Sequence, residues 1–186
     1  RATGERHQYT KENAFEAFGP GLRDAPCANN GSDAGYTEIL RYNLNERRII
    51  TSSCPHYGGI EGAMVQSTGI TVPLFPYFDE SPGIIADLSQ QNGAIAYARD
   101  GVAIYSPYAG HGNTTRVWNA LSASKDSMDK CGGQVSPQGE YHYHTVPSCL
   151  LSDLDDSTSS ASPHSAQIGW AADGFPIYGP SGPDGI

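Results

Sequence analysis

The chain has few basic residues and no long apolar segment. Of its 186 residues, 11 are Lys or Arg and 20 are Asp or Glu, which gives a formal net charge of −9. Nucleic-acid binding needs clustered cations that neutralise phosphates, and the basic pair Arg47-Arg48 fits the solvated side of a strand better. No run of 18 apolar residues occurs, so no membrane-spanning helix is predicted. These absences argue against a nucleic-acid partner and against a membrane span.

Apolar residues are also sparse. They make up 38% of the chain, which argues against a helical bundle rich in Leu and Ala. Gly (22) and Pro (13) together approach one fifth of the residues, and Tyr occurs 11 times. Tyr suits the half-buried surface of a strand, whereas Gly and Pro favour turns. We therefore expect a mostly β fold, namely a compact, loop-rich β-sandwich or barrel-like domain with one or two short helices.

The sequence contains no Cys-x-x-Cys pair, so the usual spacing of a structural zinc site is absent. Its four cysteines, Cys27, Cys54, Cys131 and Cys149, are widely spaced. An even number at such spacing is typical of disulfides formed in an oxidising compartment. Of the three pairings that four cysteines allow, we favour Cys131 with Cys149 and Cys27 with Cys54.

Two further features favour an extracellular or cell-surface location. N-glycosylation sequons begin at Asn30 and Asn113, both in Gly-containing polar stretches. The sequence begins at Arg1 without a Met, as expected of a mature chain whose leader has been removed. N-linked glycans are therefore predicted at both asparagines.

Residues 1–35 are predicted to form an N-terminal segment with a short helix over 11–18, and residues 36–186 the β domain. A second short helix is predicted over 116–128. Gly and Pro interrupt the apolar runs of residues 54–92, which indicates extended connections without a central strand. The acidic, Ser-rich stretch 152–162 is predicted to be an exposed loop. β-branched and aromatic runs between turn residues predict strands at 36–42, 46–52, 94–98, 102–105, 140–146, 168–171 and 175–178.

An internal repeat links two of these strands. Residues 100–107 (DGVAIYSP) match residues 173–180 (DGFPIYGP), 73 positions later, with Asp, Gly, Ile, Tyr and Pro in register. The first copy is followed by the segment YHYH at 141–144, and no second such segment follows within the 186 residues. We expect a degenerate duplication that lacks its second half here. Such a domain has an unpaired strand edge that another subunit can fill.

The segment 141–144 contains the candidate site. Alternate side chains of a strand face the same way, so His142 and His144 are predicted to share one face. Two imidazoles at this spacing can converge on one transition metal ion, with Cu and Zn as the candidates. The alternative is a structural strand that packs its tyrosines and hydrogen-bonds its imidazoles to backbone carbonyls. A complete metal site needs a third or fourth ligand, and the candidates are His56, His111, His164 and Asp173.

Two blocks of sequence surround this segment. The first comprises CGGQ at 131–134, GEYHYH at 139–144 and PSCL at 147–150, and the second is IGWAADGFPIYGP at 168–180. Together they resemble the YHYH-motif family of secreted proteins from bacteria and eukaryotic microbes. Because the biochemical activity of these proteins is largely uncharacterised, the resemblance implies a fold more than a function. The family usually has His where this chain has Gln134, which removes one candidate ligand.

The residues favour a structural or binding role over an enzyme. Ser165, His164 and Asp173 supply the residue types of a hydrolase, but the Gly-x-Ser-x-Gly elbow is absent. A metal-dependent enzyme would need an open coordination position and an acid or base, and no residue is singled out for that role. We expect an extracellular, glycosylated protein that assembles with itself into a polymer or surface layer. The alternative function is secreted binding of Cu or Zn through His142 and His144.

Overall fold

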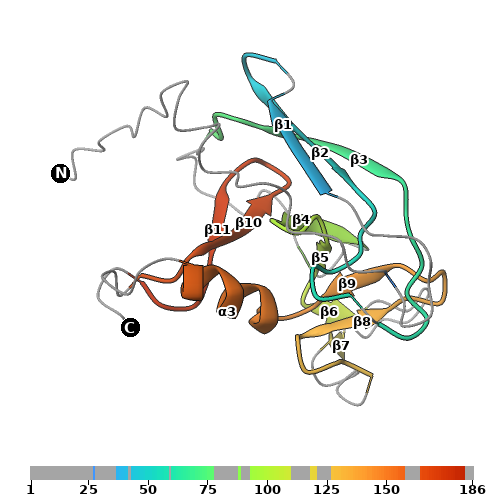
Figure 1. Cartoon of the computed structure of the whole chain (residues 1–186). Coiled ribbons are helices and arrows are strands. Elements are labelled where there is room, and N and C mark those ends of the chain that lie inside the picture. The colour runs from blue at the N-terminus through green and yellow to red at the C-terminus, as the bar shows by residue number, and fades with distance from the viewer. Residues whose placement is uncertain are drawn as a thin grey trace.

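The computed structural model describes residues 27, 37–41, 43–58, 60–77, 88, 93–109, 118–120, 127–157 and 164–182. Within these residues the chain is mostly β, as predicted, and the sheets are open rather than closed into a barrel (Figure 1). No helix in this described part is long and apolar enough to cross a membrane. Several predictions fall outside it, namely the helix over 11–18, the sequons at Asn30 and Asn113, and His111.

One sheet has three antiparallel strands in the order β1-β2-β3. The strands predicted over 36–42 and 46–52 are confirmed and form a hairpin: β1 (Thr37–Arg41) pairs with β2 (Glu46–Thr51). In the turn the side-chain oxygen of Asn43 accepts the N–H of Asn45 at 2.8 Å. β3 (Thr68–Pro73) is a strand that we did not predict within 54–92. It lies at an edge of this sheet, where its Gly and Pro are tolerated.

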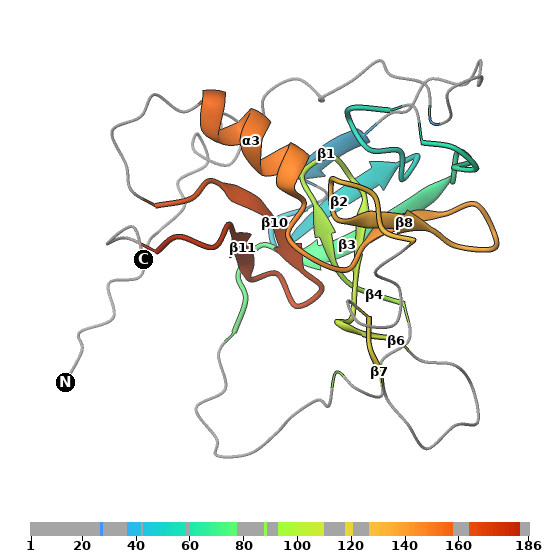
Figure 2. The same cartoon turned by 90° about the horizontal axis from the view of Figure 1, so that it is seen from below.

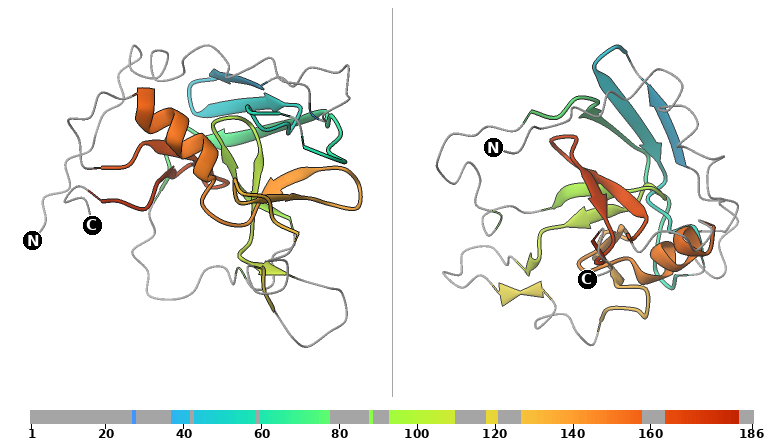
Figure 3. Two further views of the ribbon diagram at one scale, coloured as in Figure 1. Left: turned by 60° about the horizontal axis from the view of Figure 1, so that its bottom comes forward. Right: turned by 90° about the vertical axis from the view of Figure 1, so that its left-hand side faces the viewer.

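The larger sheet has six strands in the order β11-β10-β4-β5-β9-β8. β4 (Ala94–Ala98), β5 (Ala103–Tyr105), β9 (Tyr141–Tyr143), β10 (Gln167–Ala171) and β11 (Pro176–Tyr178) fall within or close to predicted strands, whereas β8 (Gly133–Val135) was not predicted. All neighbours are antiparallel except β5 and β9, which run parallel. The three-stranded sheet lies on one side of this sheet (Figure 3). The expected solvated position is wrong for Arg47, which is buried with its guanidinium 4.3 Å from the ring centroid of Trp170.

The second predicted helix, over 116–128, is wrong at its start. Trp118–Asn119 form β7, which pairs antiparallel with β6 (Tyr108–Ala109). Strand pairing with a distant segment outweighs a weak local helix preference here.

The predicted loop over 152–162 is wrong at residues 152–157, because α3 (Ser148–Ser157) occupies them. Leu150 and Leu154 lie one helical turn apart and are buried, with exposed fractions of 0% and 6%. They give the helix an apolar side, and α3 packs against β10 (Figure 2). The acidic residues dominate the composition of this stretch, but its leucines determine its structure.

Both disulfides form in the favoured pairing, Cys27–Cys54 and Cys131–Cys149. In the chain-entropy model a bridge closing a loop of this size stabilises the fold by about 3 kcal/mol. Cys131–Cys149 joins the turn before β8 to the first turn of α3. The bridges border a core whose buried members include Cys27, Cys54, Val102, Tyr141, Tyr143, Leu150 and Ile168.

Gly133 provides a test of this packing. A Cβ atom at this position would overlap the ring and hydroxyl of the buried Tyr141. We expect Gly133→Ala to lower the free energy of unfolding by about 1–3 kcal/mol, the usual cost of overpacking. The measurement is urea unfolding followed by circular dichroism.

Gly69→Ala in β3 is the matched control. Its Cβ would lie 3.3 Å from the flexible end of Arg48, so we expect a change within about 0.5 kcal/mol. Equal losses in the two variants would contradict the packing argument.

Candidate functional site

Strand β9 separates two polar clusters of different chemistry. Its side chains alternate as predicted: the rings of Tyr141 and Tyr143 lie on one face with centroids 5.5 Å apart, and those of His142 and His144 on the other, 4.9 Å apart. Both tyrosines are fully buried, and His142 is 4% exposed. We call these two sides of β9 the tyrosine face and the histidine face.

On the tyrosine face, Asp129 orients the hydroxyl of Tyr141. This hydroxyl donates to Oδ2 of Asp129 at 2.7 Å and lies 2.6 Å from the hydroxyl of Tyr57. Oδ1 of Asp129 accepts the backbone N–H groups of Cys131 (2.8 Å) and Gly133 (3.1 Å). A buried polar group without a partner costs free energy. The single carboxylate of Asp129 provides partners for two backbone N–H groups of the turn at 129–133 and for the hydroxyl of Tyr141.

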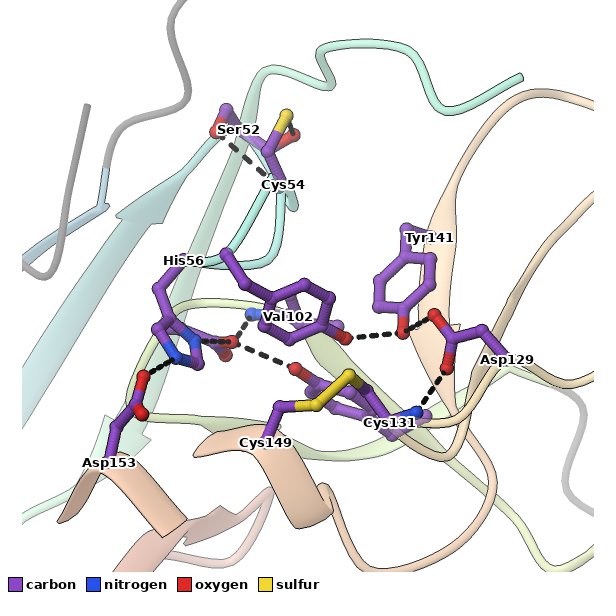
Figure 4. A network of polar contacts seen from close by, with 12 residues as sticks. Ser52, Cys54, His56, Val102, Asp129, Cys131, Tyr141, Cys149 and Asp153 are labelled. Atoms are coloured by element: carbon purple, nitrogen blue, oxygen red, sulfur yellow. Dashed lines mark hydrogen bonds and ion pairs between the residues drawn. A yellow bond between two sulfur atoms is a disulfide. The ribbon is translucent and has the colours of Figure 1, made fainter. Parts of the chain in front are cut away.

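Asp100 has the same relation to Tyr143. Its Oδ1 accepts the N–H of Val102 at 3.2 Å, and its Oδ2 accepts the hydroxyl of Tyr143 at 2.9 Å. Oδ2 also lies 3.3 Å from Nδ1 of His56, whose Nε2 is 2.5 Å from Oδ2 of Asp153 on α3. The side chain of Asp100 is fully buried, whereas that of Asp153 is 56% exposed. Figure 4 shows these contacts beside the disulfide, with Asp153 at the end that reaches solvent.

The environment of His56 favours its protonated form. Burial alone would lower its pKa, but hydrogen bonds to Asp100 and Asp153 and their charges outweigh that effect, so the pKa is raised above 6.5. The protonated imidazole is the form that offsets the buried charge of the Asp100 carboxylate.

The tyrosines of this face remain protonated. Burial is the main cause that raises the pKa of Tyr57, Tyr141 and Tyr143, and the charges of Asp100 and Asp129 raise it further. Their hydroxyls donate hydrogen bonds, that of Tyr141 to Asp129 and that of Tyr143 to Asp100. The tyrosine face is thus a structural network that reaches solvent through His56 and Asp153.

On the histidine face, both imidazoles donate through Nδ1. Nδ1 of His142 lies 3.2 Å from the carbonyl oxygen of Glu140, and Nδ1 of His144 lies 2.9 Å from that of Ser106. Because a carbonyl oxygen only accepts, Nδ1 carries the proton and Nε2 carries the lone pair. Burial lowers the pKa of His142 to about 4 and also lowers that of His144. Both rings are neutral near pH 7, which is the form that binds metals.

Tyr105 and Gln134 flank His142. The ring of Tyr105 stacks on His142, with centroids 4.1 Å apart at 22°, and its hydroxyl donates to Glu140 at 3.0 Å. Burial, together with Glu140, raises the pKa of Tyr105 to about 12. Nε2 of Gln134 lies 3.3 Å from Nε2 of His142, and its Oε1 accepts the hydroxyl of Ser127 at 2.8 Å. The side chain that lies against Nε2 of His142 is therefore the amide of Gln134.

The other predicted ligands do not join this pair. His56 belongs to the tyrosine face, and the ring of His164 lies edge-on to that of Tyr178, with centroids 4.8 Å apart. Asp173 is exposed in the turn between β10 and β11, where it accepts the N–H of Phe175. Across the residues that the structure describes, no three His, Cys, Asp or Glu side chains are arranged to hold a metal ion.

Sequence reasoning missed several residues of the two faces. Asp100 and Tyr105 carried a signal, because both recur in the internal repeat. Neither Tyr57 nor Asp129 stands out in the sequence, because their roles depend on contacts with Tyr141, 84 and 12 positions away. The remaining missed residue is Asp153, which was assigned to a loop.

The fold and these two faces define a disulfide-bonded β domain built around an alternating Tyr-His strand. A family model described as "YHYH protein" matches residues 70–184, more than half of the chain. The chain therefore belongs to the YHYH protein family, as its sequence blocks indicated. No curated protein and no solved structure was found to match it.

The pH dependence of stability tests the charge on His56. Because its pKa in the folded protein lies above 6.5, its stabilising contribution is complete below about pH 6.5 and is lost as the pH rises through the folded pKa. His142 and His144 act in the opposite sense, since their lowered pKa values make stability fall below about pH 6.5. We expect the free energy of unfolding to pass through a maximum near pH 6.5.

His56→Gln should remove the decline on the alkaline side and leave the decline on the acid side. Urea unfolding at a series of pH values, on the wild type and the variant, measures both slopes. An alkaline decline that persists in the variant would show that His56 is not its source.

Proposed function

We propose that this YHYH domain binds a transition-metal ion, Cu²⁺ or Zn²⁺, through Nε2 of His142 and His144. The observation that carries the proposal is the closeness of the two imidazoles, whose centroids are 4.9 Å apart at an interplanar angle of 80°, with Nδ1 of each at a backbone carbonyl. Metal-binding histidines commonly donate their other N–H to such an oxygen, and neutral imidazole suits Cu and Zn. Water or a bound molecule would complete the coordination.

Gln134 weakens this site relative to one with three imidazoles. Its amide nitrogen lies 3.3 Å from Nε2 of His142, where it donates to the lone pair that an ion would use. Metal binding must therefore displace this hydrogen bond. We expect an exchangeable ion rather than a permanently held structural one.

An extracellular location is part of the proposal. Two disulfides and no free cysteine among the described residues are typical of proteins from oxidising compartments. The sequons at Asn30 and Asn113 add the expectation that the protein is glycosylated.

Calorimetric titration of metal-stripped protein with Cu²⁺ and with Zn²⁺ tests the site. We expect one ion per chain, with binding lost in His144→Ala. Gln134→His should tighten binding by about tenfold or more, because it adds an imidazole beside His142, and a gain of about 1.4 kcal/mol corresponds to tenfold.

The matched control is His164→Ala, which removes an imidazole outside the pair and should leave binding unchanged. Circular dichroism checks that each variant is folded. Either of two results would refute the proposal: no stoichiometric binding by the wild type, or binding that His144→Ala leaves unaltered.

A second candidate function is self-association into an extracellular polymer or surface layer. The observation that favours it is the edge of the six-stranded sheet at β11, beyond which the described residues provide no further strand. Sheet edges are ready sites for pairing with another chain. The proposal supposes that copies of the protein join through such edges.

Light scattering over a range of concentrations tests self-association. We expect masses that rise well above the 19.8 kDa of one chain. They should return toward it in Tyr178→Lys, because Tyr178 lies on the edge strand with its side chain 41% exposed and a charge on an edge strand opposes pairing. Val146→Lys places the same charge at an exposed site outside the sheet edge and is the control. A monodisperse monomer at every concentration would eliminate this candidate.

A further inference from the structure

The internal repeat corresponds to an approximate two-fold axis within the six-stranded sheet. Each copy of the repeat supplies the turn and second strand of a hairpin, either β4-β5 or β10-β11. The first strands of the two hairpins pair with each other, and Tyr97 is directly opposite Trp170. These two positions differ by 73, the offset of the repeat. The axis therefore passes between Tyr97 and Trp170.

The symmetry extends to individual hydrogen bonds and to the bulges. Both hairpins have a register shift at the same place, between Ala94 and Ala96 in one and between Gln167 and Gly169 in the other. Backbone hydrogen bonds within each turn, and between the two hairpins, recur with both residues shifted by 73 positions. The pairs are Ala98 N to Val102 O with Ala171 N to Phe175 O, Gly101 N to Ala98 O with Gly174 N to Ala171 O, and Arg99 N to Ile168 O with Ala172 N to Ile95 O.

The symmetry ends at the outer edges. The outer edge of β5 pairs in parallel with β9, so that Ala103 is opposite His142 and Ile104 is opposite Tyr143. The equivalent edge belongs to β11, which ends the sheet as far as the structure describes it. Its residues at the equivalent positions are Pro176 and Ile177.

The two turn aspartates show what differs between the copies. Asp100 accepts the N–H of Val102 through Oδ1 and the hydroxyl of Tyr143 through Oδ2, and it is fully buried. Asp173 accepts the N–H of Phe175 in the same way, but it is exposed. The turn geometry is thus repeated, and the tyrosine from a neighbouring strand is present in the first copy.

We propose that the outer edge of β11 binds a second extended Tyr-His-Tyr strand, parallel to β11, whose tyrosine hydroxyl donates to Asp173. By the two-fold relation, Pro176 lies opposite the histidine of this strand and Ile177 opposite its second tyrosine. Pro176 has no N–H, which is tolerated at a sheet edge and leaves fewer backbone bonds for the incoming strand. The side-chain contact with Asp173 therefore provides much of the specificity. This inference is independent of metal binding, and it defines an edge through which the second candidate function would act.

The experiment uses the 186-residue protein in EDTA and a synthetic peptide with the sequence of residues 139–146, GEYHYHTV. Amide chemical shifts locate the peptide, and fluorescence anisotropy gives its affinity. We expect shifts concentrated at residues 173–178. Asp173→Asn, which keeps the side-chain oxygen that caps the turn, should weaken binding by about tenfold, because hydrogen bonds to charged groups contribute about 1.5–3 kcal/mol.

A peptide with Phe in place of its second tyrosine should bind about tenfold more weakly as well. Asp173→Asn tested with this Phe peptide should lose no more affinity than either change alone, because both remove the same hydrogen bond. Glu61→Gln, which changes an exposed carboxylate outside the repeat, is the control and should leave affinity unchanged. An absence of binding, or shifts located away from β11, would overturn the proposal. Light scattering measures self-association without the peptide, so either proposal can fail separately.

Discussion

Asp100 and Asp129 each bond to the backbone of their own turn through one oxygen and to a buried tyrosine of β9 through the other. Asp100 holds Tyr143 in this way, and Asp129 holds Tyr141. Leaving a buried hydroxyl or carboxylate without its partner costs about 1–3 kcal/mol or more. The turns and the strand therefore depend on each other, and the position of β9 between β5 and β8 follows from both.

The same constraint explains why Cys-Gly-Gly accompanies Tyr-His-Tyr-His in the sequence. Gly133 lies so close to Tyr141 that any side chain would occupy the place of the tyrosine ring. Gly132 has φ of +88°, and a Cβ there would overlap the carbonyl oxygen of Val146. Cys131 then fastens this turn to α3. Gly132, Gly133 and Cys131 are therefore explained by the packing of β9 and its attachment to α3.

The sequence predicted features that depend on local patterns. The alternation of β9, the β1-β2 hairpin and the strands of the repeat follow from residue types within a few positions. Features that depend on distant contacts were missed. Tyr143 and Asp100 are 43 positions apart, and nothing in the sequence joins them before the fold is known. For α3, charge composition indicated a loop, whereas the burial of Leu150 and Leu154 stabilises a helix.

The two faces of β9 differ in how completely their polar groups are satisfied, and the proposed metal site lies on the less satisfied face. On the tyrosine face, Tyr141 and Tyr143 both donate to carboxylates. On the histidine face, the described residues provide no hydrogen bond to Nε2 of His144, and Nε2 of His142 receives only the long contact from Gln134. Because neighbouring residues of a strand must face opposite sides, anchoring the tyrosines also fixes the imidazoles. Their lone pairs are thus held in position by bonds made on the other face, which is the preorganisation that a binding site requires.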